Sequence, residues 1–310
     1  MTSLAGILPS QLPGQKADIP SAQPILAQAY NRLPPAALML LAVISVELSW
    51  ALASVILADV GQAGTAFLST LFAATVFTVL SRPRIDGRIR RHWHLIVFFG
   101  LADACMALPF LWALRCDIPL GIASSIAFLG PLGLAVATSW RLLHFLWIGI
   151  AALGVGLLTP EIGADLNLAG LGFAAMSAVA WGAFVPATKL VGRAFGGRDG
   201  LTLGLWASSL MLAPFALAEG TMLRADATSI AGVLAVALLG AILPWAIEYS
   251  VIQRISARTY GVLVTLEPAV GALVGATFLG QAIGGRMWIA VACVSIAAMG
   301  VTLSDKSDRA

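Results

Sequence analysis

Ten long apolar stretches recur along this chain, separated by short polar connections, and they limit its fold more than any other feature. Each approaches the ~20 residues that a helix needs to cross ~30 Å of hydrocarbon. Their hydrophobic residues run continuously instead of alternating, which is typical of helices and not of barrel strands. The predicted spans are residues 36–57, 61–80, 94–114, 118–138, 142–159, 168–189, 201–218, 230–252, 259–279 and 286–303.

The composition agrees with a membrane environment. The chain is 59% hydrophobic and 11% charged, whereas soluble domains contain about 25% charged residues. The net charge of +3 does not indicate nucleic-acid binding, because the basic residues lie between apolar stretches and form no patch with aromatic residues. The sequence therefore predicts an all-α polytopic membrane protein with ten transmembrane helices in a lipid bilayer.

The positions of Lys and Arg predict the orientation of the spans. Short loops that are rich in these residues stay on the cytoplasmic side of a membrane. With the N-terminus inside, 15 of the 18 basic residues are cytoplasmic, and only Arg115, Arg224 and Arg286 lie outside. Because the number of spans is even, we expect both termini in the cytoplasm.

The predicted spans divide the chain into two halves. Residues 1–33 are rich in Pro, Gln, Ala and Ser, so we expect a flexible cytoplasmic tail. Residues 34–160 form the first predicted five-helix repeat and residues 161–304 the second. Residues 305–310 form a short cytoplasmic tail.

Five spans in each half give the two halves opposite orientations in the membrane. A proline lies inside spans four and nine, at Pro131 and Pro268, and a tryptophan lies at similar places in spans one and six, at Trp50 and Trp181. These matches predict inverted repeats, a common arrangement in secondary transporters.

Acidic residues inside the spans are the strongest functional signal. An ionised carboxylate in hydrocarbon costs several kcal/mol, so intramembrane acids suggest function by default. They either lie near water or hold a proton, because loss of water disfavours the charged form. Such a group suits proton exchange or binding of an ammonium, and a protonated carboxyl that only bonds a neighbouring helix is the structural alternative. The predicted substrate- or proton-binding residues are Glu47, Asp103, Glu248 and Glu267.

Prolines and aromatic residues in the same spans are further candidates. A proline inside a helix removes one backbone donor and frees a carbonyl, which either binds a cation or amine or simply shapes the bundle. The predicted kinks are at Pro109, Pro131, Pro244 and Pro268. Aromatic side chains could line a substrate cavity, and the candidates are Phe128, Trp181, Trp245 and Tyr249.

Motifs of several enzyme and pump classes are absent from the sequence. The chain has no Gly-x4-Gly-Lys-Ser/Thr loop for ATP, no His-Glu-x2-His zinc pair and no Gly-x-Ser-x-Gly elbow. We therefore expect no cofactor, no metal and no enzymatic activity. A small molecule and protons are the expected partners, and both a monomer and a homodimer stay open.

Several segments resemble a known family. They are 118–123 and 128–132 in span four, Leu243-Pro-Trp-Ala-Ile-Glu248 in span eight, and 258–261, 266–269 and 278–280 around span nine. With the ten-span layout, they make the chain similar to the EamA family of the drug/metabolite transporter superfamily, and most of all to its threonine/homoserine exporters. The likeness is most specific from about residue 239 to 280 and extends from about 36 to 303.

The resemblance implies proton-coupled export of small amino acids or related metabolites across a bacterial inner membrane by alternating access. Glu248 and Glu267 fall on acidic positions of the family. The chain departs from the family at Ala127, where exporters have an acid, and near Leu68, where they have a basic residue. We hypothesise that Glu47 replaces the missing acid. The alternatives are an exporter of hydrophobic drugs or aromatic metabolites, and an intramembrane enzyme or non-transporting membrane subunit.

Overall fold

The computed structural model describes residues 35–137, 142–158, 167–195, 197–252, 266–282 and 284–304. The chain divides into two units, Met1–Pro34 and Pro35–Ala310, and every described helix belongs to the second. The predicted N-terminal tail and the C-terminal tail lie outside the described residues. All regular structure in the described part is helical, which confirms the all-α class.

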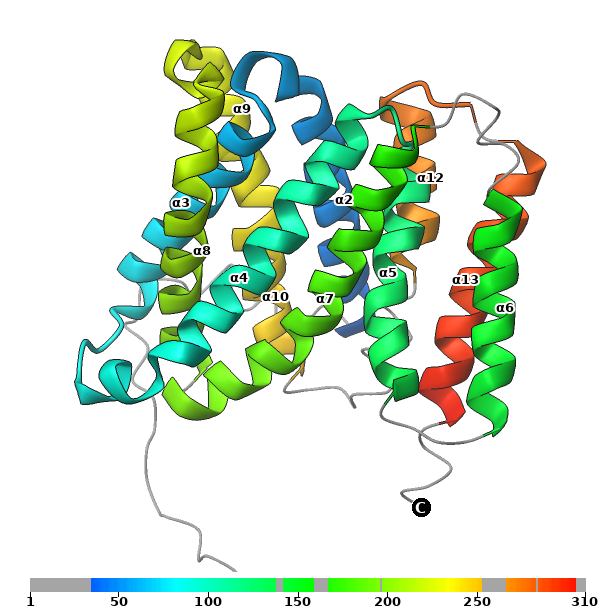
Figure 1. Ribbon diagram of the computed structural model, residues 1–310, viewed down its shortest axis with the longest axis horizontal. Helices are drawn as coiled ribbons and strands as arrows, with labels where there is room; N and C mark the ends of the chain where they lie inside the picture. The colour runs from blue at the N-terminus through cyan, green and yellow to red at the C-terminus, as the bar shows by residue number, and fades with distance from the viewer. Residues whose placement is uncertain are drawn as a thin grey trace, which may run out of the picture. The chain divides into compact units, whose positions relative to one another are not determined.

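The helices follow one another with short connections (Figure 1). In chain order they are α2 (Pro35–Val60), α3 (Gln62–Ser81), α4 (Gly87–Arg115), α5 (Leu120–Ala137), α6 (Leu142–Leu158), α7 (Leu168–Phe195), α8 (Gly197–Glu219), the 3₁₀-helix η1 (Thr221–Arg224), α9 (Ala227–Ala237), the π-helix η2 (Leu238–Ile242), α10 (Leu243–Ile252), α12 (Glu267–Phe278) and α13 (Gly285–Ser304).

Helical structure occupies part or all of each predicted span. In the described part of the chain, six helices are long and apolar enough to cross a membrane: Ala37–Ile56, Gln62–Ser81, Gly87–Arg115, Leu168–Phe195, Arg198–Glu219 and Ala227–Ile247. Two more, Leu120–Pro131 and Gly285–Ala297, are apolar but shorter. The protein is therefore a multi-pass membrane protein, and the count of ten spans stays a prediction.

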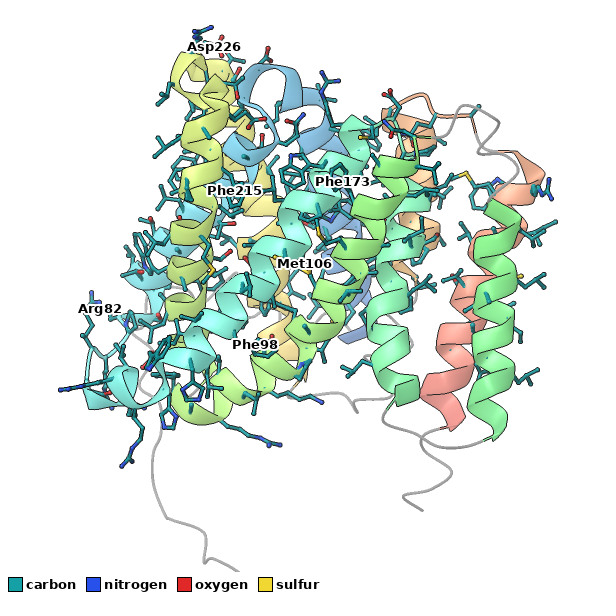
Figure 2. The ribbon with its side chains drawn as sticks, in the orientation of Figure 1. Arg82, Phe98, Met106, Phe173, Phe215 and Asp226 are labelled. Atoms are coloured by element: carbon teal, nitrogen blue, oxygen red, sulfur yellow. The ribbon has the colours of Figure 1, made fainter. Side chains whose placement is uncertain are left out.

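The distribution of side chains agrees with a lipid environment. Large apolar side chains such as Leu210 and Val179 are 76% and 75% exposed, whereas Ser208 and Ser177 are buried. Figure 2 shows apolar side chains directed away from the bundle along its length. A water-soluble fold would bury these groups, but hydrocarbon solvates them as well as a protein core does.

Helices from the two predicted halves pack closely against one another. α3 lies beside α8, α6 beside α13, and α5 beside α12 (Figure 1). α7 packs against α4 and α5, and in the same way α2 packs against α9, η2, α10 and α12. Thus α2, the first helix of the first half, packs mainly against helices of the second half, and α7, the first helix of the second half, packs mainly against helices of the first.

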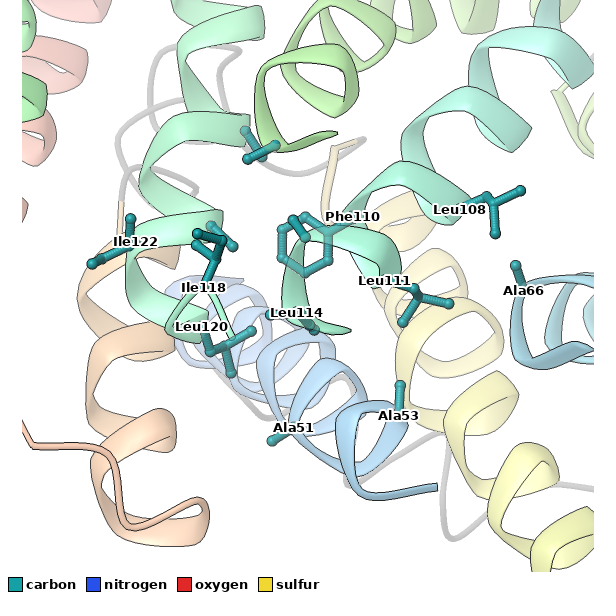
Figure 3. Close-up of a cluster of buried hydrophobic side chains, with 14 of the residues drawn as sticks. Ala51, Ala53, Ala66, Leu108, Phe110, Leu111, Leu114, Ile118, Leu120 and Ile122 are labelled. Carbon is teal, nitrogen blue, oxygen red and sulfur yellow. The ribbon is translucent and has the colours of Figure 1, made fainter. Parts of the chain in front are cut away.

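The largest apolar core joins the C-terminal part of α2, the C-terminal part of α4 and the start of α5. Figure 3 shows Phe110 of α4 directed toward Ile118, which precedes α5, whereas Leu111 points to the other side of α4. The core includes Phe110, Leu111, Leu114, Ile118 and Leu120, and each of these side chains is at most 9% exposed. Small residues of α2, among them Ala51 and Ala53, complete it.

A carboxylate from α8 caps the start of α3. The Glu219 side chain accepts from the backbone N–H of Gln62 at 3.1 Å, of Ala63 at 2.9 Å and of Gly64 at 3.2 Å. These donors have no partner within their own helix, and a negative charge at a helix N-terminus is favourable. Gly61 precedes the helix at φ +80°, and a Cβ there would collide with the Glu219 carboxylate. The two halves are therefore joined at this end by α3 and α8.

Candidate functional site

Glu47 lies where α2 meets α5 and α12. Its side chain is 2% exposed and accepts a hydrogen bond from Ser124 Oγ, at 3.1 Å to Oε1 and 3.2 Å to Oε2. Gly271 of α12 faces the same group, because a Cβ at that position would lie 2.8 Å from Glu47 Oε2 and 3.0 Å from Ser124 Oγ. The carboxyl therefore fills the space that the missing side chain leaves.

The surroundings of Glu47 supply few groups to stabilise a negative charge. Among the residues that the structure describes, no Lys, Arg or His forms an ion pair with it. One neutral hydroxyl offsets little of the cost of burying an ionised carboxylate, which is several kcal/mol.

The opposite side of α2 is fixed to the second half by two serines. Ser45 and Ser49 are four residues apart and share one face of the helix, whereas Glu47 between them points to another face. Ser45 Oγ donates to the Leu239 carbonyl at 2.6 Å and Ser49 Oγ donates to the Val236 carbonyl at 3.0 Å. α2 is thus held on one side while it presents Glu47 to α5 and α12 on the other.

Pro244 follows the π-helix η2, whose Leu239 carbonyl accepts from Ser45. In η2 the Leu243 N–H bonds to the Leu238 carbonyl, five residues earlier. The same pattern would pair the Leu239 carbonyl with residue 244, but proline has no N–H. Ser45 supplies the missing donor. The carbonyl freed by Pro244 is therefore bound by the protein itself, which favours the bundle-shaping interpretation of this kink.

The other predicted prolines lie in different settings. Pro109 is inside α4 and Pro131 is inside α5. Pro268 stands in the first turn of α12, where its missing N–H breaks no bond of the described helix. The residues before 266 in that predicted span lie outside the described part, so its predicted mid-helix kink stays a prediction.

Glu267 begins α12 and lies one turn before Gly271. Residues four apart share a helix face and are about 6 Å apart along the axis. Glu267 is half-buried and lies on the face of α12 that carries Gly271, which contacts Glu47. Glu248 and Tyr249 belong to α10, but their side chains lie outside the described part.

Asp103 forms a second buried carboxyl–serine pair. Its side chain is 8% exposed and accepts from Ser208 Oγ of α8 at 2.7 Å. Gly100, one turn earlier, allows α8 to approach, because a Cβ there would lie 2.7 Å from the Ala207 Cβ. This pair joins α4 to α8, whereas the Glu47 pair joins α2 to α5, so the structure does not connect these two acids by hydrogen bonds.

The predicted aromatic residues form two contacts along α7. Phe128 of α5 and Trp181 have ring centroids 6.0 Å apart in an edge-to-face arrangement. Trp245 of α10 meets Phe184 in the same manner at 5.6 Å. Both tryptophans are half-buried and pack against the cluster that contains Phe99 and Phe184. Phe128 and Trp245 thus each take part in an aromatic contact with a residue of α7, and Trp181 is one of those two α7 residues.

Sequence reasoning missed the serine partners of both acids. Ser124 is 77 positions from Glu47, and Ser208 is 105 positions from Asp103, so no local spacing indicates either pair. One signal was available, since Gly271 begins a Gly-x3-Gly motif that predicts close helix approach. Among the described residues no cluster of three His, Cys, Asp or Glu side chains could hold a metal ion.

Comparisons with known proteins agree with a membrane exporter. Residues 168–303 match the model of the EamA-like transporter family. The chain is 29% identical over 278 residues to the threonine/homoserine exporter RhtA of Escherichia coli K12, covering 88% of this chain and 93% of that protein. It is 28% identical over 277 residues to RhtA of Salmonella typhimurium SL1344, covering 87% and 92%.

A solved crystal structure shares the fold. It aligns with a TM-score of 0.55 and 19% identity, and it covers 88% of this chain and 99% of its own. The match to the family model falls on α7 to α13, the part that contains Trp181, Trp245 and Glu267. The predicted resemblance is therefore confirmed: residues 168–303 of this membrane protein are similar to the EamA-like transporter family, and most of the chain is similar to named exporters.

Proposed function

We propose that this protein is a secondary transporter that exports small amino acids, such as threonine or homoserine, or related metabolites in exchange for protons. Its similarity to named threonine/homoserine exporters over most of the chain supports the class of substrate. The basic residues of the cytoplasmic connections support a bacterial inner-membrane protein with both termini inside. In this proposal the chain is not an enzyme, and its partners are the substrate, protons and lipid.

The burial of Glu47 is the observation that carries the mechanism. Among the described residues, the hydrogen bond to Glu47 comes from the neutral Ser124 hydroxyl, and in this proposal the enclosed carboxyl carries a proton. If the helices that enclose it separate, water reaches it and the proton leaves. A substrate ammonium could then replace the proton beside the carboxylate. Competition between these two cations for one acid couples export to proton entry.

The helix packing supports two inverted repeats and alternating access. In an inverted repeat, α2 corresponds to α7, α4 to the segment from α9 to α10, and α5 to α12. The contacts of α7 with α4 and α5 then correspond to those of α2 with that segment and with α12. The two remaining pairs of corresponding helices, α3 with α8 and α6 with α13, pack directly against each other. Halves related in this way could open first to one side and then to the other.

The remaining predicted residues take supporting roles in this proposal. Glu267 and Glu248 lie on the family's acidic positions and would share the proton or the ammonium with Glu47. Asp103, held by Ser208, is the weakest candidate because its bond joins a separate pair of helices. The aromatic residues Phe128, Trp181, Trp245 and Tyr249 would line the substrate path.

The test measures transport in proteoliposomes with an imposed pH gradient. We expect Glu47→Gln to abolish the acceleration of threonine or homoserine flux by the gradient, because the amide cannot carry a proton. Glu47→Asp should retain part of it. The matched control is Asp226→Asn, the same acid-to-amide change at the exposed start of α9, which should leave gradient-driven flux intact. A Glu47→Gln protein with unchanged dependence on the gradient would contradict the mechanism, and Glu248→Gln and Glu267→Gln test the other two acids.

A second substrate class follows from the aromatic contacts. The edge-to-face pairs of Trp181 and Trp245 would favour a hydrophobic drug or aromatic metabolite over a small polar amino acid. Competition of both classes against labelled threonine separates these alternatives. Failure of any solute to move under a pH gradient would favour an enzyme or a non-transporting subunit.

A further inference from the structure

One end of the bundle carries an exposed cationic surface, here called the basic end surface. Its six cationic residues come from two segments that are distant in sequence, one at residues 82–91 and one at the end of α7. They are Arg82 and Arg84 in the α3–α4 connection, Arg90 and Arg91 in the first turns of α4, and Lys189 and Arg193 in the last turns of α7, all exposed. Figure 2 shows nitrogen-tipped side chains gathered around the labelled Arg82, at the lower end of the bundle in that view.

Specific contacts hold these elements together as one surface. Arg88 Nη1 donates to the Phe195 carbonyl at the end of α7 at 3.2 Å, and the His92 ring lies edge-on to the Phe195 ring at 6.1 Å. The Arg84 backbone N–H donates to Asp199 of α8 at 3.5 Å. The cationic side chains are therefore displayed from a fixed base and not from independent loops.

The acids in this region do not cancel its charge. Asp86 accepts from Arg88 Nε, at 3.1 Å to Oδ1 and 2.8 Å to Oδ2, and so neutralises Arg88, which is not one of the six. Asp199 accepts from the backbone of Arg84. From residue 81 to 94 and from 188 to 199 these are the only two acids in the sequence. The basic end surface thus keeps a strong positive field.

Apolar side chains are exposed among the cations. Ile85 is 88% exposed and Trp93 is 59% exposed. The helix geometry of α4 breaks at His92, at φ −120° and ψ 21°, so the turn that carries Arg90 and Arg91 departs from the axis of the span. Tryptophan at the end of a span lies at the level of lipid headgroups. Water alone would not favour Ile85 and Trp93 in these positions, whereas the headgroup–acyl boundary would.

We propose that the basic end surface binds the headgroups of anionic phospholipids, with Ile85 and Trp93 in the upper acyl region. Arginine pairs with phosphate oxygens through parallel hydrogen bonds, and juxtamembrane clusters of four to eight basic residues are typical of anionic-lipid binding. The proposal concerns neither the exported solute nor its proton coupling, so it holds whether or not the transport function is correct. It assigns these residues a binding role in addition to their effect on topology.

The test compares binding of dioleoyl phosphatidylglycerol and dioleoyl phosphatidylcholine to the purified protein by native mass spectrometry over a range of lipid concentrations. We expect selective retention of phosphatidylglycerol. Each basic residue near a membrane surface contributes about fivefold to such binding, so Arg90→Gln with Arg91→Gln should weaken it roughly 25-fold. Arg90→Lys with Arg91→Lys keeps the charge, and most of the affinity should remain.

The matched control removes two charges from the other end of the spans. Arg224→Gln with Arg286→Gln changes the net charge equally and should leave phosphatidylglycerol affinity unchanged. Equal weakening by both Gln pairs would show that net charge alone attracts the lipid and would overturn the proposal. Equal affinity for the two lipids in the unmodified protein would overturn it as well.

Discussion

The crossing of α5 and α7 is so close that one added methyl group should disrupt it. A Cβ at Gly130 would meet the carbonyl oxygen of Ala178 and would lie 2.6 Å from the carbonyl carbon, whereas ordinary contacts begin at 3.4 Å. On the other side, a Cβ at Gly182 would lie 3.0 Å from the Gly130 oxygen. Both obstacles are backbone atoms, so a side-chain rotation cannot relieve them. Gly130→Ala must therefore push the two helices apart.

The cost of this separation can be estimated from packing. A gap of 0.5–1 Å removes about a quarter to a half of the attraction between facing atoms, and overpacking a tight core typically costs about 1–3 kcal/mol. Alanine returns about 0.5–1 kcal/mol through its higher helix propensity. The expected net loss for Gly130→Ala is therefore roughly 0–2.5 kcal/mol.

Gly133 provides a control in the same helix. A Cβ there has nothing within 4 Å, so Gly133→Ala should have only the propensity gain, at most about 1 kcal/mol. Unfolding of both variants in mixed micelles with increasing dodecyl sulfate, followed by tryptophan fluorescence, gives the two stabilities. We expect Gly130→Ala to unfold first and Gly133→Ala to match or exceed the unmodified protein. Equal stability of the two variants would refute the close crossing.

Three further predictions concern hydrogen bonds away from this crossing. Glu219→Ala leaves three N–H groups at the start of α3 without their charged acceptor. It should lower the free energy of unfolding by about 1–3 kcal/mol in the same micelle assay. An unchanged free energy of unfolding would contradict the cap. Ser45→Ala leaves the Leu239 carbonyl without its donor and should cost about 1 kcal/mol, whereas Ser54→Ala, whose hydroxyl bonds within its own helix, should be nearly silent. The backbone N–H of Ser229 lowers the pKa of Asp226, so its stabilising effect is present above the unfolded pKa of about 3.9 and fades as the pH falls through the folded value. Asp226→Asn should therefore reduce the loss of stability between pH 5 and pH 2 on acid titration, and an unchanged acid profile would contradict this.

The helix positions were predictable from hydropathy, but their ends were not. The apolar stretch 61–80 corresponds closely to α3, Gln62–Ser81. In contrast, the predicted span 168–189 became α7, Leu168–Phe195, and span 94–114 became α4, Gly87–Arg115. A hydropathy window ends where charged residues begin, whereas a helix continues into the headgroup region while its backbone bonds persist.

The candidate site was predictable only in part because its contacts are distant in sequence. Glu47 stands out in the sequence because an acid in an apolar stretch is rare. Ser124 does not, since serine is common in membrane helices and its partner lies on another helix. Pro244 predicted a local fault in helix bonding, but a missing N–H does not reveal that a π-helix forms or that Ser45 will donate to the unpaired carbonyl.

The Glu219 cap has a consequence for how the chain is made. The acceptor follows the first turn of α3 by 155 to 157 residues. A ribosome adds about 5–20 residues per second, so roughly 8 to 30 s pass before α8 emerges to complete that turn. During this interval the waiting donors depend on other partners, such as water at the membrane boundary. A fragment that stops before residue 219 never gains that partner, and full consolidation of the early helices must await synthesis of the later half.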